Sequence, residues 1–202
     1  MEIAAADLNA ESAYRLLVGA VVPRPIAWVT TLSESGRTNA APFSCFTFVC
    51  YAPPMVAISV GRKGDVLKDT ARNIAARKEF VVNIGDDSLV EPLHMTSAEY
   101  PDDISEVQEL GLDLLPSREI QTPRISVAPI NLECRLHDVF EFGELRTQLI
   151  VGEVRYFHIR DGLCENGKID TALLRPLGRL GGPKYVTLGE IITMKPVPAS
   201  FG

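Results

Sequence analysis

The sequence predicts a mainly β protein, an antiparallel barrel with helical excursions, in a single domain over residues 1–202. Three observations predict this class. Predicted strands outnumber predicted helices, most neighbouring strands are joined by hairpin turns, and no βαβαβ alternation occurs. A chain of 202 residues, 46% hydrophobic and 23% charged, is long enough to bury one full core.

The first half of the chain combines two helices with four strands. Residues 9–18 predict a short helix, which Asn9 or Ser12 would cap. Apolar residues recur on one helical face over 65–78, so a second helix is expected there with Asp65 as its cap. The strands are rich in β-branched and aromatic residues, the first two form a hairpin, and they are expected at 26–32, 38–43, 55–60 and 80–84.

The second half begins with a less regular region. A helix is expected over 87–97, followed at 98–124 by an excursion over the sheet surface that contains a helix at 104–110. Strands resume after Pro129. The long ones are expected at 130–139 and 145–159, and short pieces near 170–175 and 184–193.

One motif in this half imitates a nucleotide-binding loop. Residues 162–168 (GLCENGK) match most of the phosphate-loop consensus, but Ile169 replaces the Ser or Thr that would hold Mg²⁺. The pair Asn166-Gly167 is typical of a hairpin turn. We therefore expect a hairpin at this place.

Charge and composition exclude several classes of function. With 20 Lys+Arg against 26 Asp+Glu the net charge is -6, so neither nucleic acid nor an anionic membrane is expected as a partner. No apolar run approaches the roughly 20 residues of a membrane span, and the N-terminus has no signal-peptide pattern. Zinc-type ligand spacing is absent, so no metal is expected. We expect four reduced, mostly buried cysteines in a cytoplasmic protein.

A basic cluster marks the point where a predicted strand ends and the second helix begins. Arg62 and Lys63 follow the strand, and Lys68 and Thr70 lie in the first turns of the helix. Helix N-termini present unpaired N–H groups and partial positive charge, so a phosphate group fits there. The cluster taken alone also fits a solvated face of an amphipathic helix.

Residues 39–47 (NAAPFSCFT) combine small, hydroxyl and aromatic side chains at a strand end. Such a mixture suits a flat heteroaromatic ligand that needs stacking surface and hydrogen bonds. A strand-to-loop corner packed by aromatic rings explains the segment equally well. On the preceding strand, Thr30 and Thr31 fall on opposite faces, so at least one hydroxyl is expected to point inward.

A third segment, residues 176–185 (PLGRLGGPKY), predicts a fixed irregular loop because it holds two prolines and three glycines. Arg179 and Tyr185 are placed to point from this loop into a cleft. The segment taken alone also fits a structural turn.

These segments form an ordered set of motifs that resembles the flavin reductase-like family, whose domains are FMN-binding split β-barrels and which includes the flavoredoxins. The matching pieces cover about residues 24–186. They are RPIAWVTT (24–31), NAAPFSCFT (39–47), the KDT..N helix start (68–73), PRI (123–125), APINLEC (128–134), VGEV (151–154) and RLGGPKY (179–185).

The resemblance implies a set of FMN-binding residues. The phosphate would lie near Arg62, Lys63, Lys68 and Thr70. The ring and ribityl chain would lie against Thr30, Thr31, Asn39, Ala41, Pro42, Phe43 and Ser44. His158 is similar to a family position near the flavin, although a structural histidine is an equal alternative, and Tyr185 resembles the late loop that approaches the cofactor. Cys45 is interpreted as small-residue packing.

The resemblance also implies an activity and its partners. The protein would be a flavin reductase that passes hydride from NAD(P)H to FMN, and a homodimer with FMN close to the subunit interface. Electrons would leave to an acceptor protein or a monooxygenase partner. The alternatives are a flavoredoxin-like FMN electron carrier, which never reacts directly with a nicotinamide, and a non-catalytic flavin-binding barrel.

Overall fold

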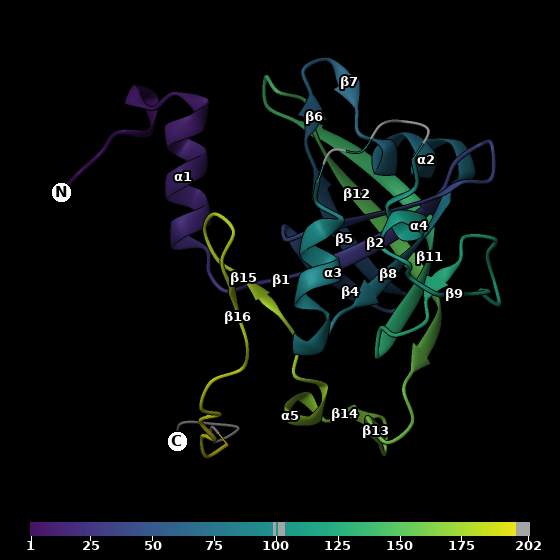
Figure 1. Cartoon of the computed structure of the whole chain (residues 1–202). Coiled ribbons are helices and arrows are strands. Elements are labelled where there is room, and N and C mark those ends of the chain that lie inside the picture. The colour runs from purple at the N-terminus through teal and green to yellow at the C-terminus, as the bar shows by residue number, and fades with distance from the viewer. Residues whose placement is uncertain (99, 101–103, 197–202) are drawn as a thin grey trace.

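A seven-stranded antiparallel sheet forms the body of the protein (Figure 1). The computed structural model describes residues 1–98, 100 and 104–196. The sheet has the strand order β3-β2-β8-β11-β12-β5-β4, which confirms the predicted mainly β class. Its strands are β2 (Ala27–Leu32), β3 (Thr38–Phe43), β4 (Phe46–Tyr51), β5 (Pro54–Val60), β8 (Glu79–Ile84), β11 (Ile130–Phe142) and β12 (Thr147–Ile159).

The two end strands of this sheet, β3 and β4, are consecutive in the chain. Only Ser44 and Cys45 separate them, and the Ser59 N–H donates to the Cys45 carbonyl at 2.8 Å. A connection this short reaches only about 10 Å. The sheet must therefore curl until its ends come together, which gives the predicted barrel.

Apolar side chains fill the inside of the barrel. Ile58 and Phe80 are fully buried there, together with Ile74 of helix α2 (Asp69–Arg77). A second apolar cluster surrounds Trp28, whose indole N–H donates to Thr96 Oγ1 at 2.9 Å. Burial of these faces holds α2 and the Thr96 segment against the sheet.

The N-terminal helix α1 (Ala10–Ala20) lies apart from the sheet, beside β1 and β15 (Figure 1). The Asn9 side chain accepts from the Ser12 N–H at 2.8 Å, which confirms Asn9 as the predicted cap. No residue of α1 is buried, and Tyr14 and Leu17 are 65% and 62% exposed. The helix therefore has an apolar face without a partner in the described part of the chain.

Short elements complete the fold, and no helix in the described ranges is both long and apolar enough to span a membrane. The short helices are η1 (Ala5–Asp7), η2 (Asp87–Leu89), α3 (Val90–Met95), α4 (Glu106–Glu109) and α5 (Thr171–Leu174). The short strands are β1 (Arg24–Pro25), β6 (Arg62–Lys63), β7 (Val66–Leu67), β9 (Leu114–Leu115), β10 (Arg124–Ile125), β13 (Cys164–Glu165), β14 (Lys168–Ile169), β15 (Gly178–Arg179) and β16 (Tyr185–Val186).

The start of α2 differs from the prediction. Asp65 is not the cap of this helix, which begins at Asp69 with Lys68 in the N-cap position. Residues 62–67 instead form the β6–β7 hairpin, in which Gly64 adopts a φ of 57°. Glycine reaches this left-handed conformation without strain, so turn chemistry outweighs the capping preference of aspartate.

Four further expectations need correction. The piece near 170–175, expected as a short strand, is helix α5, which Asp170 caps by accepting from the Leu173 N–H. The strand β4 was not predicted, since Pro42 and the aromatic residues after it indicated a corner. Only residues 185–186 form a strand in the piece near 184–193. The four cysteines are free thiols, but only Cys134 is buried. By contrast, β13 and β14 form the expected hairpin, with Asn166 and Gly167 both at positive φ.

Candidate functional site

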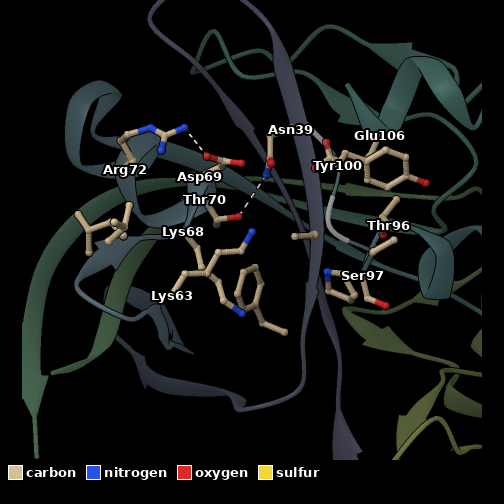
Figure 2. A pocket seen from close by; sticks show the side chains of 16 residues that line it. Asn39, Lys63, Lys68, Asp69, Thr70, Arg72, Thr96, Ser97, Tyr100 and Glu106 are labelled. Carbon is tan, nitrogen blue, oxygen red and sulfur yellow. Dashed lines mark hydrogen bonds and ion pairs between the residues drawn. The ribbon is translucent and has the colours of Figure 1, made fainter. Parts of the chain in front are cut away.

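A cavity of about 280 Å³ lies at the N-terminus of α2 (Figure 2). Lys68 at the N-cap and Lys63 from the β6–β7 hairpin line it from one side. Thr96 and Ser97 line the opposite side in Figure 2, together with Tyr100. The cavity is also lined by residues 39, 41–43, 66, 67, 69, 70, 72, 98 and 106. A helix terminus and two ammonium groups thus face one space.

The charges around this cavity favour an anion. Asp69 forms an ion pair with Arg72 three residues later, so its charge is compensated locally. Among the described residues, no ion pair or hydrogen bond involves the Lys68 ammonium, and its side chain makes no cap bond to the helix. The unpaired N–H groups of the first turn of α2 add partial positive charge.

Buried polar side chains form the floor of the cavity. With its amide oxygen toward Thr70, Asn39 accepts from Thr70 Oγ1 and donates to Glu106 Oε1, each at 3.2 Å. Asn73 of α2 donates to Thr31 Oγ1 at 3.0 Å. These bonds tie β2, β3, α2 and α4 together, because the five side chains come from four different elements. The network fixes the positions of Asn39 and Thr70.

Glu106 is the ionisable member of this floor. Burial raises the pKa of its carboxyl, and the charge of Asp69 adds to this shift, whereas the backbone N–H groups of Glu106 and Ala40 oppose it. Ala40 N–H donates to Glu106 Oε2 at 3.4 Å. Folding therefore shifts the Glu106 carboxyl toward its neutral form, relative to the unfolded chain.

This shift predicts how stability depends on pH. A carboxyl whose pKa is raised on folding stabilises the fold below its ordinary pKa of 4.5, and this contribution is lost as the pH rises through the raised value. We expect the unfolding free energy of the wild type, relative to Glu106→Gln, to fall as the pH rises above 4.5. Urea unfolding of both proteins at several pH values tests this, with Glu109→Gln on the same helix as control. The prediction would be contradicted if the unfolding free energy of the wild type, minus that of Glu106→Gln, rose with pH.

A second cavity, also of about 280 Å³, adjoins the first, since Pro42 and Ser97 line both. Arg179 and Tyr185 line its far side. The Tyr185 hydroxyl lies 2.9 Å from His94 Nδ1 and is hydrogen-bonded to the Arg179 guanidinium, which also stacks 4.6 Å from the Tyr185 ring centre. Burial raises the pKa of Tyr185, although the charge of Arg179 opposes the shift, so the hydroxyl keeps its proton.

Most of the predicted side chains meet at these two cavities. The first cavity collects Asn39, Ala41, Pro42, Phe43, Lys63, Lys68 and Thr70, and the second collects Ser44 and Tyr185. Ser44 Oγ accepts from Arg24 Nε at 3.2 Å. The segments at 39–47, 62–73 and 176–185, which lie far apart in the sequence, are therefore brought together by the fold.

Three predicted residues support the site without lining it. Thr30 and Thr31 are completely buried, and Thr30 Oγ1 donates to the Pro123 carbonyl at 2.7 Å. Arg62 turns away from the first cavity and donates to Glu141 Oε1 at 2.5 Å. It also donates to the Asp65 carbonyl at 3.1 Å, so it holds the β6–β7 hairpin in place.

His158 lies elsewhere. It lines a third cavity that shares no lining residue with the other two, and its Nε2 lies 2.5 Å from Glu133 Oε1. The structure therefore does not bring His158 to the predicted site within one chain.

Sequence reasoning missed several residues of the two cavities. Thr96 and Ser97 fall at the end of the helix predicted at 87–97, and Tyr100 falls in the region expected to cross the sheet surface. Glu106 falls in the predicted helix at 104–110, but the sequence does not indicate that this acidic residue is buried. The sequence does not indicate a role for His94 either, because only the fold brings it next to Tyr185.

Comparisons with known proteins agree with this geometry. Residues 18–175 match the Flavin reductase like domain. Nitrilotriacetate monooxygenase component B from Bacillus cereus is 36% identical, with a TM-score of 0.93 over 96% of this chain and 98% of that chain. The 2-nitrobenzoate 2-nitroreductase NbaA of Pseudomonas fluorescens is also 36% identical, with a TM-score of 0.89 over 98% and 97%.

A more distant structure bears on the fold alone. A protein with a split barrel domain from Shewanella frigidimarina is 18% identical, with a TM-score of 0.86 over 98% of this chain and 100% of that chain. The barrel described above is thus the predicted split β-barrel. On the domain match and these likenesses, the chain belongs to the flavin reductase-like family.

Proposed function

We propose that this protein is an NAD(P)H:flavin oxidoreductase that binds FMN with its phosphate at the N-terminus of α2. The observation that carries the proposal is the meeting of Lys63, Lys68 and the first turn of α2 at one cavity. A phosphate dianion is the chemical group that such a set of donors fits best. Membership of a flavin reductase-like family supports the same cofactor class.

The two adjoining cavities fit the two ends of FMN. The first offers the ammonium groups and the Thr70 hydroxyl to the phosphate, and the apolar side chains of Pro42 and Phe43 continue toward the second. Each cavity alone is near the lower end of the range of about 300–1,000 Å³ for small-molecule sites, and both together lie inside it. The protein's part is then to bind and orient, while the bound flavin supplies hydride chemistry with a nicotinamide.

The second cavity would hold the ring end. Tyr185 keeps its proton and is oriented by His94 and Arg179, so it offers a fixed hydroxyl donor. Ser44 adds a second hydroxyl, held by Arg24. Thr31 would act at one remove from the cofactor, because its hydroxyl accepts from Asn73 of α2, the helix that carries the lining residue Thr70.

We also propose a homodimer, with the flavin site close to the interface. Apolar side chains are exposed on α1 and on the edge strand β4, where Phe48 and Tyr51 are 75% and 89% exposed. A second copy would cover such surfaces, which a monomer leaves in water. We expect sedimentation at micromolar concentration to give twice the 22.1 kDa of one chain. A single species of 22.1 kDa would contradict the dimer.

The electron acceptor is proposed from likeness alone. The Bacillus cereus relative is by name a monooxygenase component, which favours a monooxygenase partner that receives the electrons. The free thiols fit the reducing cytoplasm as the compartment.

Steady-state kinetics separate the reductase from the electron carrier. We expect the protein to accelerate NADH or NADPH oxidation when FMN is added, with a rate that follows enzyme concentration. A protein that binds FMN but leaves both nicotinamides unreacted would be the carrier or a non-catalytic flavin barrel.

A further inference from the structure

The third cavity, of about 530 Å³, has no part in the proposed flavin site. It lies at the end of the β11–β12 pair, where basic and aromatic side chains converge. Its lining includes the basic and aromatic residues Arg118, Arg124, Arg160, Tyr156 and His158, and also Asn131.

A β-bulge explains why polar side chains face this cavity. The β11–β12 register shifts between Glu133 and Cys134, so that Arg155 has no partner across the pair. One extra residue reverses the alternation of side chains along the strand. Val154 packs in the barrel core before the bulge, whereas Tyr156 and His158 point to the outer face beyond it. Their cross-strand partners, Glu133 and Asn131, lie on the same face.

A chain of buried amides holds Arg124. Asn83 is fully buried, and its Oδ1 accepts from Asn131 Nδ2 at 2.9 Å and from the Ile125 N–H at 2.9 Å. Asn131, 1% exposed, in turn accepts from Arg124 Nη1 at 3.2 Å. The guanidinium is thereby fixed from the interior of the sheet.

A buried carboxylate fixes the opposite wall. Glu133 is fully buried and accepts from the N–H groups of Arg118 at 2.8 Å and Glu119 at 2.7 Å, besides its contact with His158. Burial opposes ionisation of Glu133, but the His158 contact and the two N–H bonds outweigh it and lower the pKa. Of the buried polar side chains, Asn131 lines the cavity, whereas Asn83 and Glu133 hold residues that line it.

The charges that line the cavity are not balanced within it. Arg124 Nε is buried and has no hydrogen-bond partner in the described part of the chain. The Arg118 guanidinium stacks over the Tyr156 ring at 5.5 Å and makes no hydrogen bond to the described residues. Arg160 pairs with Asp86 at 3.2 Å, and Asp161 is the acidic residue of the lining. An anion would complete the donor set.

We propose that this cavity is a second binding site, for a phosphate monoester attached to or next to a planar ring. Among the described residues, no carboxylate accepts from the Arg118 or Arg124 guanidinium groups, whereas a phosphate dianion offers three oxygens. The Tyr156 ring, already stacked with Arg118, provides a flat surface beside them. Aryl phosphates carry the phosphate on the ring itself, and a phosphorylated nicotinamide dinucleotide carries its 2′-phosphate on the ribose next to the adenine ring.

Calorimetric titration of flavin-free protein tests the site without reference to FMN. The probes are phenyl phosphate, NADP⁺ and NAD⁺. We expect phenyl phosphate or NADP⁺ to bind at least tenfold more tightly than NAD⁺. Arg118→Gln and Arg124→Gln should each weaken that binding at least tenfold. Arg155→Gln serves as the matched control, because Arg155 is an exposed arginine of β12 next to Tyr156 and does not line the cavity. If phenyl phosphate and NADP⁺ bind equally well, the ligand is a free aryl phosphate. If NADP⁺ binds more tightly than phenyl phosphate, the ligand is the dinucleotide.

Two results would overturn the site. The first is that Arg118→Gln and Arg124→Gln leave the affinities for NADP⁺, NAD⁺ and phenyl phosphate unchanged. The other is phosphate binding that Lys68→Ala abolishes and both arginine variants spare, since the probe would then occupy the α2 cavity. Because the Arg118 guanidinium makes no hydrogen bond to the described residues, the Arg118→Gln variant keeps the test valid if Arg124→Gln fails to fold.

Discussion

Lys68→Ala should weaken FMN binding at least tenfold while the fold stays intact. The ammonium lies at the N-cap of α2 and faces the first cavity, where it would pair with the phosphate. A hydrogen bond to a charged group contributes about 1.5–3 kcal/mol. That range corresponds to a factor of ten or more in the dissociation constant. Titration followed by flavin fluorescence quenching measures it.

The same substitution is mild for the helix itself. Lys68 makes no side-chain cap bond, so its removal takes no hydrogen bond from α2. Lys168→Ala, an exposed lysine of the β13–β14 hairpin, is the matched control for the loss of one charge. If the wild type and Lys68→Ala have the same FMN dissociation constant, the basic cluster is a solvated helix face and does not bind the phosphate.

Among flavins, FMN should bind most tightly, FAD less tightly and riboflavin worst. The first cavity offers one helix terminus and two lysines, which suits a single terminal phosphate. Riboflavin lacks that phosphate, so we expect a gap of at least tenfold from FMN, roughly 1.4 kcal/mol. Salt should narrow the gap, because Lys63 and Lys68 are exposed and their attraction to a dianion is screened.

Calorimetry of the three flavins at low and high ionic strength measures this ranking. Riboflavin binding as tight as FMN binding at both ionic strengths would exclude a phosphate site at α2. Tight FMN binding without salt dependence would instead place the phosphate away from the two lysines.

Local signals in the sequence predicted most of the framework. The hairpin over 26–43 and the cap Asn9 depend on neighbours in the chain, and both are confirmed. The start of α2 was predicted too early, because the turn preference of Gly64 and the capping preference of Asp65 favour different structures. The segment forms the β6–β7 hairpin, and the helix begins after it. The strand β4 was missed because exposed aromatic residues on an edge strand lack the alternation of a half-buried strand.

The site was predictable where the motif residues themselves line a cavity. Lys68, Thr70 and Pro42 belong to that group. Arg62 belongs to the basic cluster and Thr30 to the RPIAWVTT motif, but their hydrogen-bond partners lie far along the chain. These are the Glu141 carboxylate of β11 and the Pro123 backbone carbonyl. Within one chain, His158 lines a different cavity from the other predicted residues, because the β-bulge at Arg155 reverses the face to which it points.

The central claim is that this protein binds FMN and reduces it with a nicotinamide, and anaerobic mixing of the FMN-loaded protein with NADH or NADPH tests it most directly. The visible absorption band of oxidised flavin is the readout. We expect the band to bleach in a single turnover with at least one of the two nicotinamides. A band that persists with both would contradict the account, and so would purified protein that takes up no FMN at all.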